Sequence, residues 1–307
     1  MTLLADSMLL PGHDVPLGRY TTVRRLLPQR ERRMVGAWCF VDHFGPDDVA
    51  GVPGMQIGPH PHTGLQTVTW LVEGAVLHRD SLGSLATIRP GQVNVMTAGH
   101  GIAHSEESPA DHPPVIHGLQ LWIAMPDGAR HREPGFDRHT DLPVLRTGGL
   151  TATVIAGELC GLNSPLATYT PLLGAEIVLD GHPSTPLALN PDFEHGVLVM
   201  SGSARVVGTD LTPGSLLYLG RGRAELDLFG PDGTRLFLLG GEPFDEPLVM
   251  WWNFVARTHE EIVQAREDWM AGRRFGTVTG YAGDPLPAPE MPFVRLKARG
   301  RDGQTSE

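Results

Sequence analysis

Two stretches of the chain repeat one order of short apolar runs and tight turns. Residues 65–99 read LQTVTWLVEGAVLHRDSLGSLATIRPGQVNVMTAG, and Pro90-Gly91 precedes the last apolar run. Residues 195–241 repeat this order, with Pro213-Gly214 at the corresponding break. Short runs rich in β-branched and aromatic residues, separated by Gly and Pro, are typical of strands. The repeat therefore predicts an all-β chain built as two stacked β-barrels or sandwiches.

Length and composition fit this interpretation. The 307 residues are enough for two domains, and 41% hydrophobic with 19% charged residues is typical of a globular chain. The 38 glycines and 27 prolines show no collagen-like period, which favours many turns between short strands. We expect one domain over residues 1–148 and the second over residues 149–307.

One segment near the C-terminus carries a helix signal. Thr258 and Glu261 have the spacing of a capping box, and Gly272 is a suitable stop, so a helix is predicted over 258–272. Its apolar stripe is expected to pack on a barrel and comprises Ile262, Ala265 and Trp269. The tail from Gly283 is Pro-rich and then polar, and its last stretch is expected to be mobile.

Charge and cysteine content exclude several classes of protein. The net charge, 24 − 35 = −11, disfavours direct nucleic-acid binding, which needs a basic face. No apolar run reaches membrane-spanning length, and the N-terminus lacks the pattern of a signal peptide. Cys39 and Cys160 lie far apart and form no motif, so no disulfide framework is expected. The expected location is cytoplasmic, with no membrane partner.

Two pairs of side chains have the spacing of metal ligands. His60 and His62 are one residue apart, and so are His104 and Glu106. Residues i and i+2 of a strand project from the same face, about 6.5 Å apart, so each pair can offer two ligands to one ion. The strand–turn–strand between the pairs can bring them together as three imidazoles and one carboxylate. The alternative is a polar turn for the first pair and a surface ion pair for the second.

Other histidines receive structural interpretations. His100 lies between two glycines and is expected in a turn, and His117 is expected in the core or beside a ligand. Four stand alone in polar surroundings and are expected to be solvated: His78, His112, His131 and His139.

The chain resembles the pirin family from about Phe40 to about Phe275. Four strings carry the resemblance: HPHTGLQTVTWLVEG, PGQVNVMTAGHGIAHSEE, HGLQLWI and GEPFDEPLVMWWNFVARTHEEI. The resemblance implies two tandem cupin domains of the double-stranded β-helix (jelly-roll) type, with a short C-terminal helix. It also implies that one metal in the N-terminal cupin is bound by four ligands: His60, His62, His104 and Glu106. Iron is the usual metal of pirins, several members have quercetin 2,3-dioxygenase activity, and mammalian pirin is a nuclear cofactor of transcription regulators.

The chain departs from the general cupin pattern in two places. Gln66 stands where the first cupin motif usually has a glutamate, so the acid is expected from Glu106, as in pirins. In the second repeat only Glu194 and His195 stand near the ligand positions, and adjacent residues of a strand face opposite sides. The C-terminal cupin is therefore expected to be metal-free, with a structural or pocket-forming role.

Such a ligand set suits a first-row transition metal and leaves coordination positions open for dioxygen or substrate. The expected cofactor is Fe(II), with Mn, Ni, Co, Cu or Zn as alternatives. In the enzyme interpretation, a flavonol such as quercetin binds the metal through its 3-hydroxyl, and Glu106 acts as ligand or as the base. The apolar walls would be drawn from residues such as Trp70, Met96 and Trp122.

Two other functions fit the same residues. One is a metal- or redox-sensing regulatory protein that binds a protein partner, in which the oxidation state of the metal changes the charge at the site. The other is a cupin whose metal is only structural.

Overall fold

The computed structural model describes residues 7–17, 21–181 and 186–304. These residues divide by their contacts into two compact units. One, the second-repeat unit, has its described residues in 7–13, 24–43, 139–181 and 186–244. The other, the first-repeat unit, has its described residues in 14–17, 21–23, 44–138 and 245–304. The expected linear division at residue 148 stays a prediction, whereas the contacts group residues 245–304 with the first repeat.

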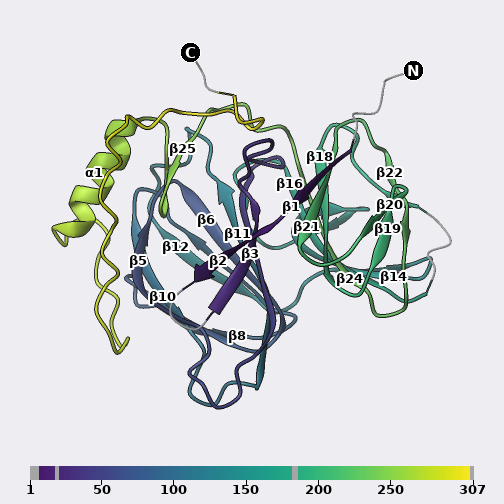
Figure 1. Ribbon diagram of the computed structural model, residues 1–307, viewed down its shortest axis with the longest axis horizontal. Helices are drawn as coiled ribbons and strands as arrows, with labels where there is room; N and C mark the ends of the chain where they lie inside the picture. Colours follow the sequence, from purple (N-terminus) through teal and green to yellow (C-terminus); the bar gives the residue numbers. More distant parts are fainter. Residues whose placement is uncertain (1–6, 18–20, 182–185, 305–307) are drawn as a thin grey trace. The chain divides into compact units, whose positions relative to one another are not determined.

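Antiparallel strands form the first-repeat unit (Figure 1). One sheet, which also takes in chain from residues 24–43, has the order β12 (Gly135–His139), β9 (Val93–Thr97), β6 (Leu65–Glu73), β11 (Val115–Ala124), β4 (Trp38–Asp48), β3 (Thr21–Leu27) and β2 (His13–Leu17). A second sheet has the order β5 (Gln56–His62), β10 (Ile102–Glu107), β7 (Val76–Asp80) and β8 (Leu85–Ile88). The hairpin β25 (Val249–Trp251) and β26 (Phe254–Ala256) completes its strands.

The second-repeat unit has the same construction. Its large sheet has the order β1 (Met8–Pro11), β21 (Ser215–Gly220), β18 (Glu194–Ser201), β24 (Arg235–Gly241), β16 (Leu172–Leu179), β14 (Leu150–Leu159) and β13 (Val144–Thr147), and β15 (Leu162–Asn163) pairs with β14. Smaller sheets join β17 (Leu187–Ala188) to β22 (Glu225–Leu226), and β20 (Thr209–Leu211) to β19 (Ala204–Val206) and β23 (Leu228–Phe229).

The predicted strand–turn–strand order is confirmed in both repeats. Gly74, after β6, and Gly202, after β18, both have φ in the left-handed region, at +99° and +80°. At Gly202 a Cβ would also lie 2.7 Å from the Thr234 Oγ1, so the turn requires glycine. These turns let consecutive strands pack their apolar side chains into a common interior. In the second barrel this interior is a leucine-rich cluster that includes Val197 and Val199.

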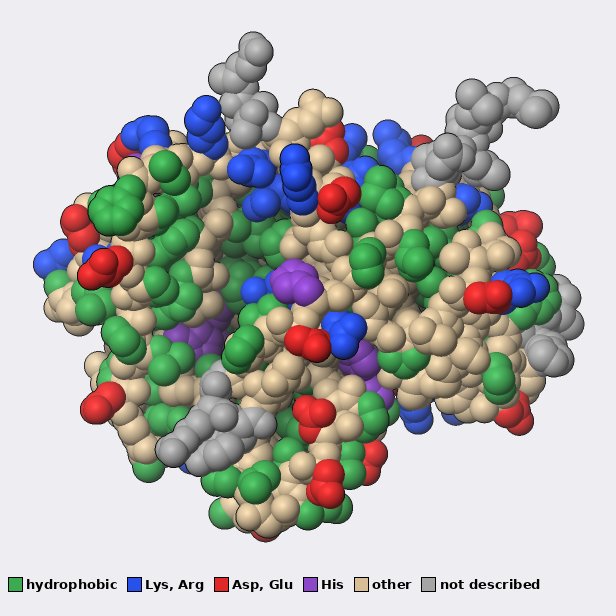
Figure 2. Space-filling view, in the orientation of Figure 1, with side chains coloured by type: hydrophobic (Ala, Val, Ile, Leu, Met, Phe, Trp, Pro, Cys, Tyr) green, Lys and Arg blue, Asp and Glu red, His purple; other side chains and the backbone are tan. Residues whose placement is uncertain are grey.

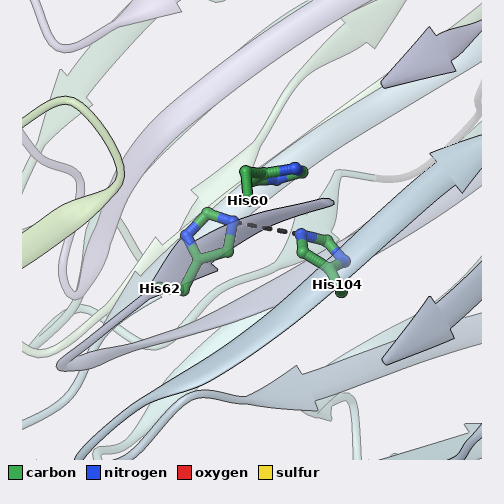
Figure 3. A group of neighbouring side chains, drawn as sticks. All are labelled: His60, His62 and His104. Carbon is green, nitrogen blue, oxygen red and sulfur yellow. Dashed lines mark hydrogen bonds between the residues drawn. The ribbon is translucent and has the colours of Figure 1, made fainter. Parts of the chain in front are cut away.

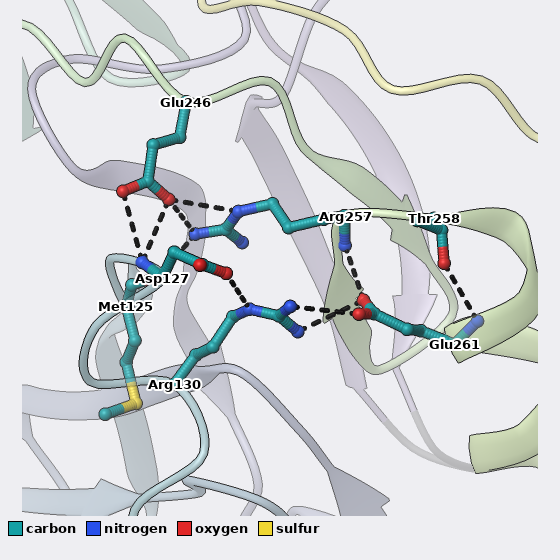
Figure 4. A network of polar contacts seen from close by, with 7 residues as sticks. All are labelled: Met125, Asp127, Arg130, Glu246, Arg257, Thr258 and Glu261. Carbon is teal, nitrogen blue, oxygen red and sulfur yellow. Dashed lines mark hydrogen bonds and ion pairs between the residues drawn. The ribbon is translucent and has the colours of Figure 1, made fainter.

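The predicted C-terminal helix is confirmed as α1 (His259–Met270), which is capped by the Thr258 side chain accepting from the Glu261 N–H. Figure 4 shows how this segment is fixed within the first-repeat unit. The Arg130 guanidinium donates to both carboxylate oxygens of Glu261 at 2.9 and 3.1 Å. Arg257 donates through Nε to Glu246, which also accepts from the Asp127 N–H. These partly buried ion pairs hold the helix and its preceding loop to residues of the first barrel.

Hydrogen bonds connect the segment after the helix to other parts of its unit. The Leu286 N–H donates to the Pro59 carbonyl at 2.8 Å, and the Leu296 N–H donates to His259 Nδ1 at 3.1 Å. A bridge pairs Leu248 with Arg299. Residues 305–307, the end of the stretch expected to be mobile, lie outside the described residues.

In the described part of the chain, no helix is both long and apolar enough to cross a membrane. On the face drawn in Figure 2, acidic and basic side chains lie among hydrophobic and neutral ones.

Candidate metal centre

Two neighbouring strands bring three histidines together. His60 and His62 lie on β5, and His104 lies opposite His60 on the antiparallel strand β10. The ring centroids are 4.4 to 5.0 Å apart, and one ring nitrogen from each histidine lies within 4.8 Å of the others. Figure 3 shows the three imidazoles converging, with Nε2 of His62 3.1 Å from Nε2 of His104. Such a buried group of nitrogen donors could hold a metal ion.

Backbone carbonyls fix the orientation of two of the three rings. The His60 Nδ1 lies 2.9 Å from the Gly58 carbonyl oxygen, and the His62 Nδ1 lies 3.1 Å from the Asn253 carbonyl oxygen. A carbonyl only accepts, so Nδ1 carries the proton in both rings. In these tautomers the Nε2 atoms of both rings carry a lone pair that a metal can bind.

The third ring is held by a chain of side chains. The His104 Nδ1 lies 3.4 Å from His78 Nδ1, and the His78 Nε2 lies 3.1 Å from Asp80 Oδ2. The other oxygen, Asp80 Oδ1, accepts from the N–H groups of Leu82 and Ser84, each at 2.9 Å. Because the carboxylate can only accept, the protons are ordered along the chain. His78 donates to Asp80 and accepts from His104, which leaves Nε2 of His104 free for a metal.

The interpretation of His78 as solvated is therefore wrong. Its side chain is 3% exposed and stacks on Phe136 with the ring centroids 4.4 Å apart. The reason is alternation along β7, where Val76, His78 and Asp80 all point inward. This period of two was present in the sequence and could have identified His78. The prediction for His100 is confirmed, since it lies in a turn.

Burial keeps the cluster neutral. It lowers the pKa of His60 to about 4. It also lowers the pKa of His62 and His104 well below the usual value, and the neighbouring imidazoles add to this effect. At neutral pH all three rings therefore present uncharged nitrogens, the form that binds a metal.

Glu106 is buried beside this cluster but is not one of the three grouped residues. The pairing of β10 with β5 shifts register between His104 and Glu106, at a bulge. The Thr69 hydroxyl donates to Glu106 Oε1 at 3.3 Å, and burial raises the pKa of the Glu106 carboxyl. Glu106 lies opposite His78 in the pairing of β10 with β7, and its role as fourth ligand remains a prediction.

The residues expected around the site are all buried. Trp122 packs edge-on against His62 at 5.2 Å between ring centroids. Trp70 and Met96 are 2% and 1% exposed and belong to the core. Gln66, at the usual position of the cupin glutamate, donates to the Thr97 hydroxyl at 3.0 Å.

Glu194 and His195 face opposite sides of β18 in the second-repeat unit, as predicted. The Glu194 carboxylate accepts from the Gly36 N–H at 3.0 Å and from the Tyr218 hydroxyl at 2.9 Å. His195 shares the interior face with Val197. The two side chains are therefore not placed to bind one ion together.

Comparison with known proteins assigns the chain to a family. The model of the pirin family matches residues 20–123, and the model of the pirin C-terminal cupin domain matches residues 174–276. A protein of Pseudomonas aeruginosa is 48% identical over 278 residues, which are 90% of this chain and 88% of that protein. The chain belongs to the pirin family. The predicted all-β bicupin fold is thereby confirmed.

Two further pirin-like proteins support this assignment. A pirin-like protein of Caulobacter vibrioides is 39% identical over 87% of this chain and 94% of its own length. A crystal structure of quercetin 2,3-dioxygenase from Acinetobacter baumannii superposes with a TM-score of 0.92 at 44% identity, covering 94% of this chain and 97% of that one. The Pseudomonas protein is likewise named, provisionally, as a quercetin 2,3-dioxygenase.

Proposed function

We propose that this pirin-family protein is a metal-dependent dioxygenase that opens the heterocyclic ring of a flavonol such as quercetin. The observation that carries the proposal is the convergence of one ring nitrogen from each of three buried, neutral histidines, His60, His62 and His104. The names of the similar Pseudomonas and Acinetobacter proteins support the choice of reaction.

The donor set fits a first-row transition metal. Imidazole nitrogens with one carboxylate suit Fe, Mn, Co, Ni, Cu or Zn, and we propose Fe(II) because the reaction requires dioxygen chemistry. A bound metal would supply a Lewis acid that acidifies the flavonol 3-hydroxyl and a centre at which dioxygen can react. Glu106 would be the fourth ligand, oriented by the Thr69 hydroxyl.

Side chains beside the histidines would orient the substrate. Trp122 beside His62 offers an aromatic face for a flat ring system. In the balanced reaction, both atoms of one dioxygen molecule enter the ester product, and the carbon that bore the 3-hydroxyl leaves with its oxygen as carbon monoxide. The proton of that hydroxyl passes to Glu106 or to solvent.

The experiment is an anaerobic loading of tag-free protein with Fe(II), followed by quercetin and then dioxygen. We expect loss of the flavonol absorbance and one carbon monoxide per flavonol consumed. The matched control is His62→Ala, which removes one ligand. Absence of turnover by the iron-loaded protein, or equal turnover by His62→Ala, would refute the proposal.

A regulatory function is the competing outcome. It predicts a protein partner captured only in one oxidation state of the metal and lost in Glu106→Gln, with no consumption of quercetin. The acidic balance of the chain favours such a protein partner over nucleic acid.

A further inference from the structure

The second-repeat unit contains a cavity of its own. Its volume is about 330 Å³, and its apolar lining residues include Leu159, Leu173, Leu189 and Phe193. Glu158 and Asn190, both exposed, are among its polar lining residues. Apolar walls with a few polar groups are typical of small-molecule sites, and this volume is at the lower end of their range.

A buried imidazole lies behind this wall. His195 is 0% exposed, and in the part of the chain that the structure describes neither of its ring nitrogens has a hydrogen-bond partner. Buried polar groups are nearly always paired, so an unpaired imidazole marks a place where a partner is expected.

His195 does not line the cavity itself but lies near two residues that do. Its ring centroid is 6.3 Å from that of Phe193. A Cβ on Gly240 would lie 3.0 Å from His195 Cδ2 and 3.2 Å from Leu173 Cβ, so His195 and Leu173 meet over this glycine. On β18, His195 shares the inward face with Val197, which belongs to the barrel interior. The imidazole therefore adjoins two residues of the cavity wall.

The chemistry of the imidazole selects the ligand. Burial, together with the nearby positive charge of Arg223, lowers the pKa of His195 to about 4. At neutral pH the ring is thus uncharged and offers one N–H donor and one lone pair. A hydroxyl group, which both donates and accepts, matches this pair. The Glu158 carboxylate lines the cavity and disfavours an anion there, while the positive charge of Arg223 acts on His195 from outside the lining residues.

We propose that this pocket is a second, metal-independent binding site for a single-ring phenol, whose ring packs on Phe193 and the leucines and whose hydroxyl pairs with His195. Since the imidazole is fully buried, the half-buried Phe193 ring has to turn aside for the hydroxyl to reach it. The site does not depend on the dioxygenase function, because none of its residues belongs to the three-histidine cluster.

The test titrates 4-methylphenol into the full chain after metal removal with a chelator, so that the phenol cannot bind a metal. Imidazole ¹⁵N resonances and ligand-observed NMR report binding. We expect the His195 signals to shift, and 4-methylphenol to bind about tenfold more tightly than toluene, as one hydrogen bond implies. We also expect it to bind more tightly than 4-methylbenzoate.

Two variants make the test decisive. His195→Phe should abolish the preference for 4-methylphenol over toluene. Ala188 is exposed and lines the cavity, so the larger side chain of Ala188→Trp should block it. This variant should bind neither 4-methylphenol nor toluene, while the imidazole signals of His195 remain. Unshifted His195 resonances, tighter binding of the benzoate, or an unchanged preference in His195→Phe would overturn the proposal.

Discussion

Asp80→Asn should weaken metal binding although the residue lies two side chains away from the metal. In the folded chain Asp80 Oδ1 accepts two backbone N–H groups, and Oδ2 accepts from His78. In the variant the single amide oxygen is required by Leu82 and Ser84, so the amide NH₂ faces His78 Nε2. His78 must then carry its proton on Nδ1, where it meets the Nδ1 proton of His104.

The expected magnitude follows from the number of ligands affected. Only His104 loses its hydrogen bond, because His60 and His62 are held by backbone carbonyls. Loss of one such partner of a metal ligand typically lowers metal affinity by about 10- to 100-fold, or about 1.4 to 2.7 kcal/mol. His78→Phe should have an effect of the same size, since it keeps the stacking on Phe136 but offers no acceptor.

The assay is a competition titration of Co(II) or Zn(II) between the chain and a chromophoric chelator. Thermal unfolding of the metal-free variants checks that the barrel is intact. His195→Phe is the matched control, because it removes a buried histidine of the other unit and should leave metal affinity unchanged. Wild-type metal affinity in a well-folded Asp80→Asn protein would refute the ordered chain of hydrogen bonds.

Three further predictions concern stability. Burial holds the pKa of His195 near 4 in the folded chain, against about 6.5 in the unfolded chain. The unfolding free energy is therefore not reduced by protonation of His195 above pH 6.5, and it falls as the pH decreases from 6.5 toward 4. His195→Leu should reduce the loss of unfolding free energy between pH 7 and pH 5 by about 2 kcal/mol, measured by urea unfolding; an unchanged loss would contradict this. Thr258→Ala should cost about 1 kcal/mol through the lost helix cap, whereas Thr258→Ser should not, as measured by the midpoint of thermal unfolding. Gly157→Ala should cost at least about 2 kcal/mol in the same assay, because φ is +67° and a Cβ would lie 1.5 Å from the Leu172 carbonyl oxygen; a wild-type midpoint would show that the strand can shift.

Local spacing carried much of what could be predicted. The one-residue separation of His60 and His62 predicted that both side chains lie on the same face of a strand. The strand–turn–strand that follows predicted that His104 comes back beside them. Thr258 and Glu261 similarly marked the start of α1. In each case the structure-forming interaction spans few residues or follows the period of the element, so the sequence contains the signal.

Long-range contacts could not be predicted in the same way. The carbonyl that fixes His62 belongs to Asn253, 191 residues away, and a backbone acceptor leaves no mark in the side-chain pattern. The return of residues 245–304 to the first-repeat unit depends on ion pairs such as Arg130–Glu261, whose partners are residue types common on protein surfaces. The register shift between His104 and Glu106 falls opposite Gly58 and Pro59 of β5, but their presence in the sequence does not say which strand pairs there.

Anomalous diffraction above the metal absorption edge, from crystals of tag-free protein, tests the central claim most directly. A single peak within about 2.1 Å of the Nε2 atoms of His60, His62 and His104 is predicted, and its edge energy identifies the metal. A peak elsewhere in the first-repeat unit, or crystals of metal-supplemented protein with no peak at these three histidines, would contradict the account.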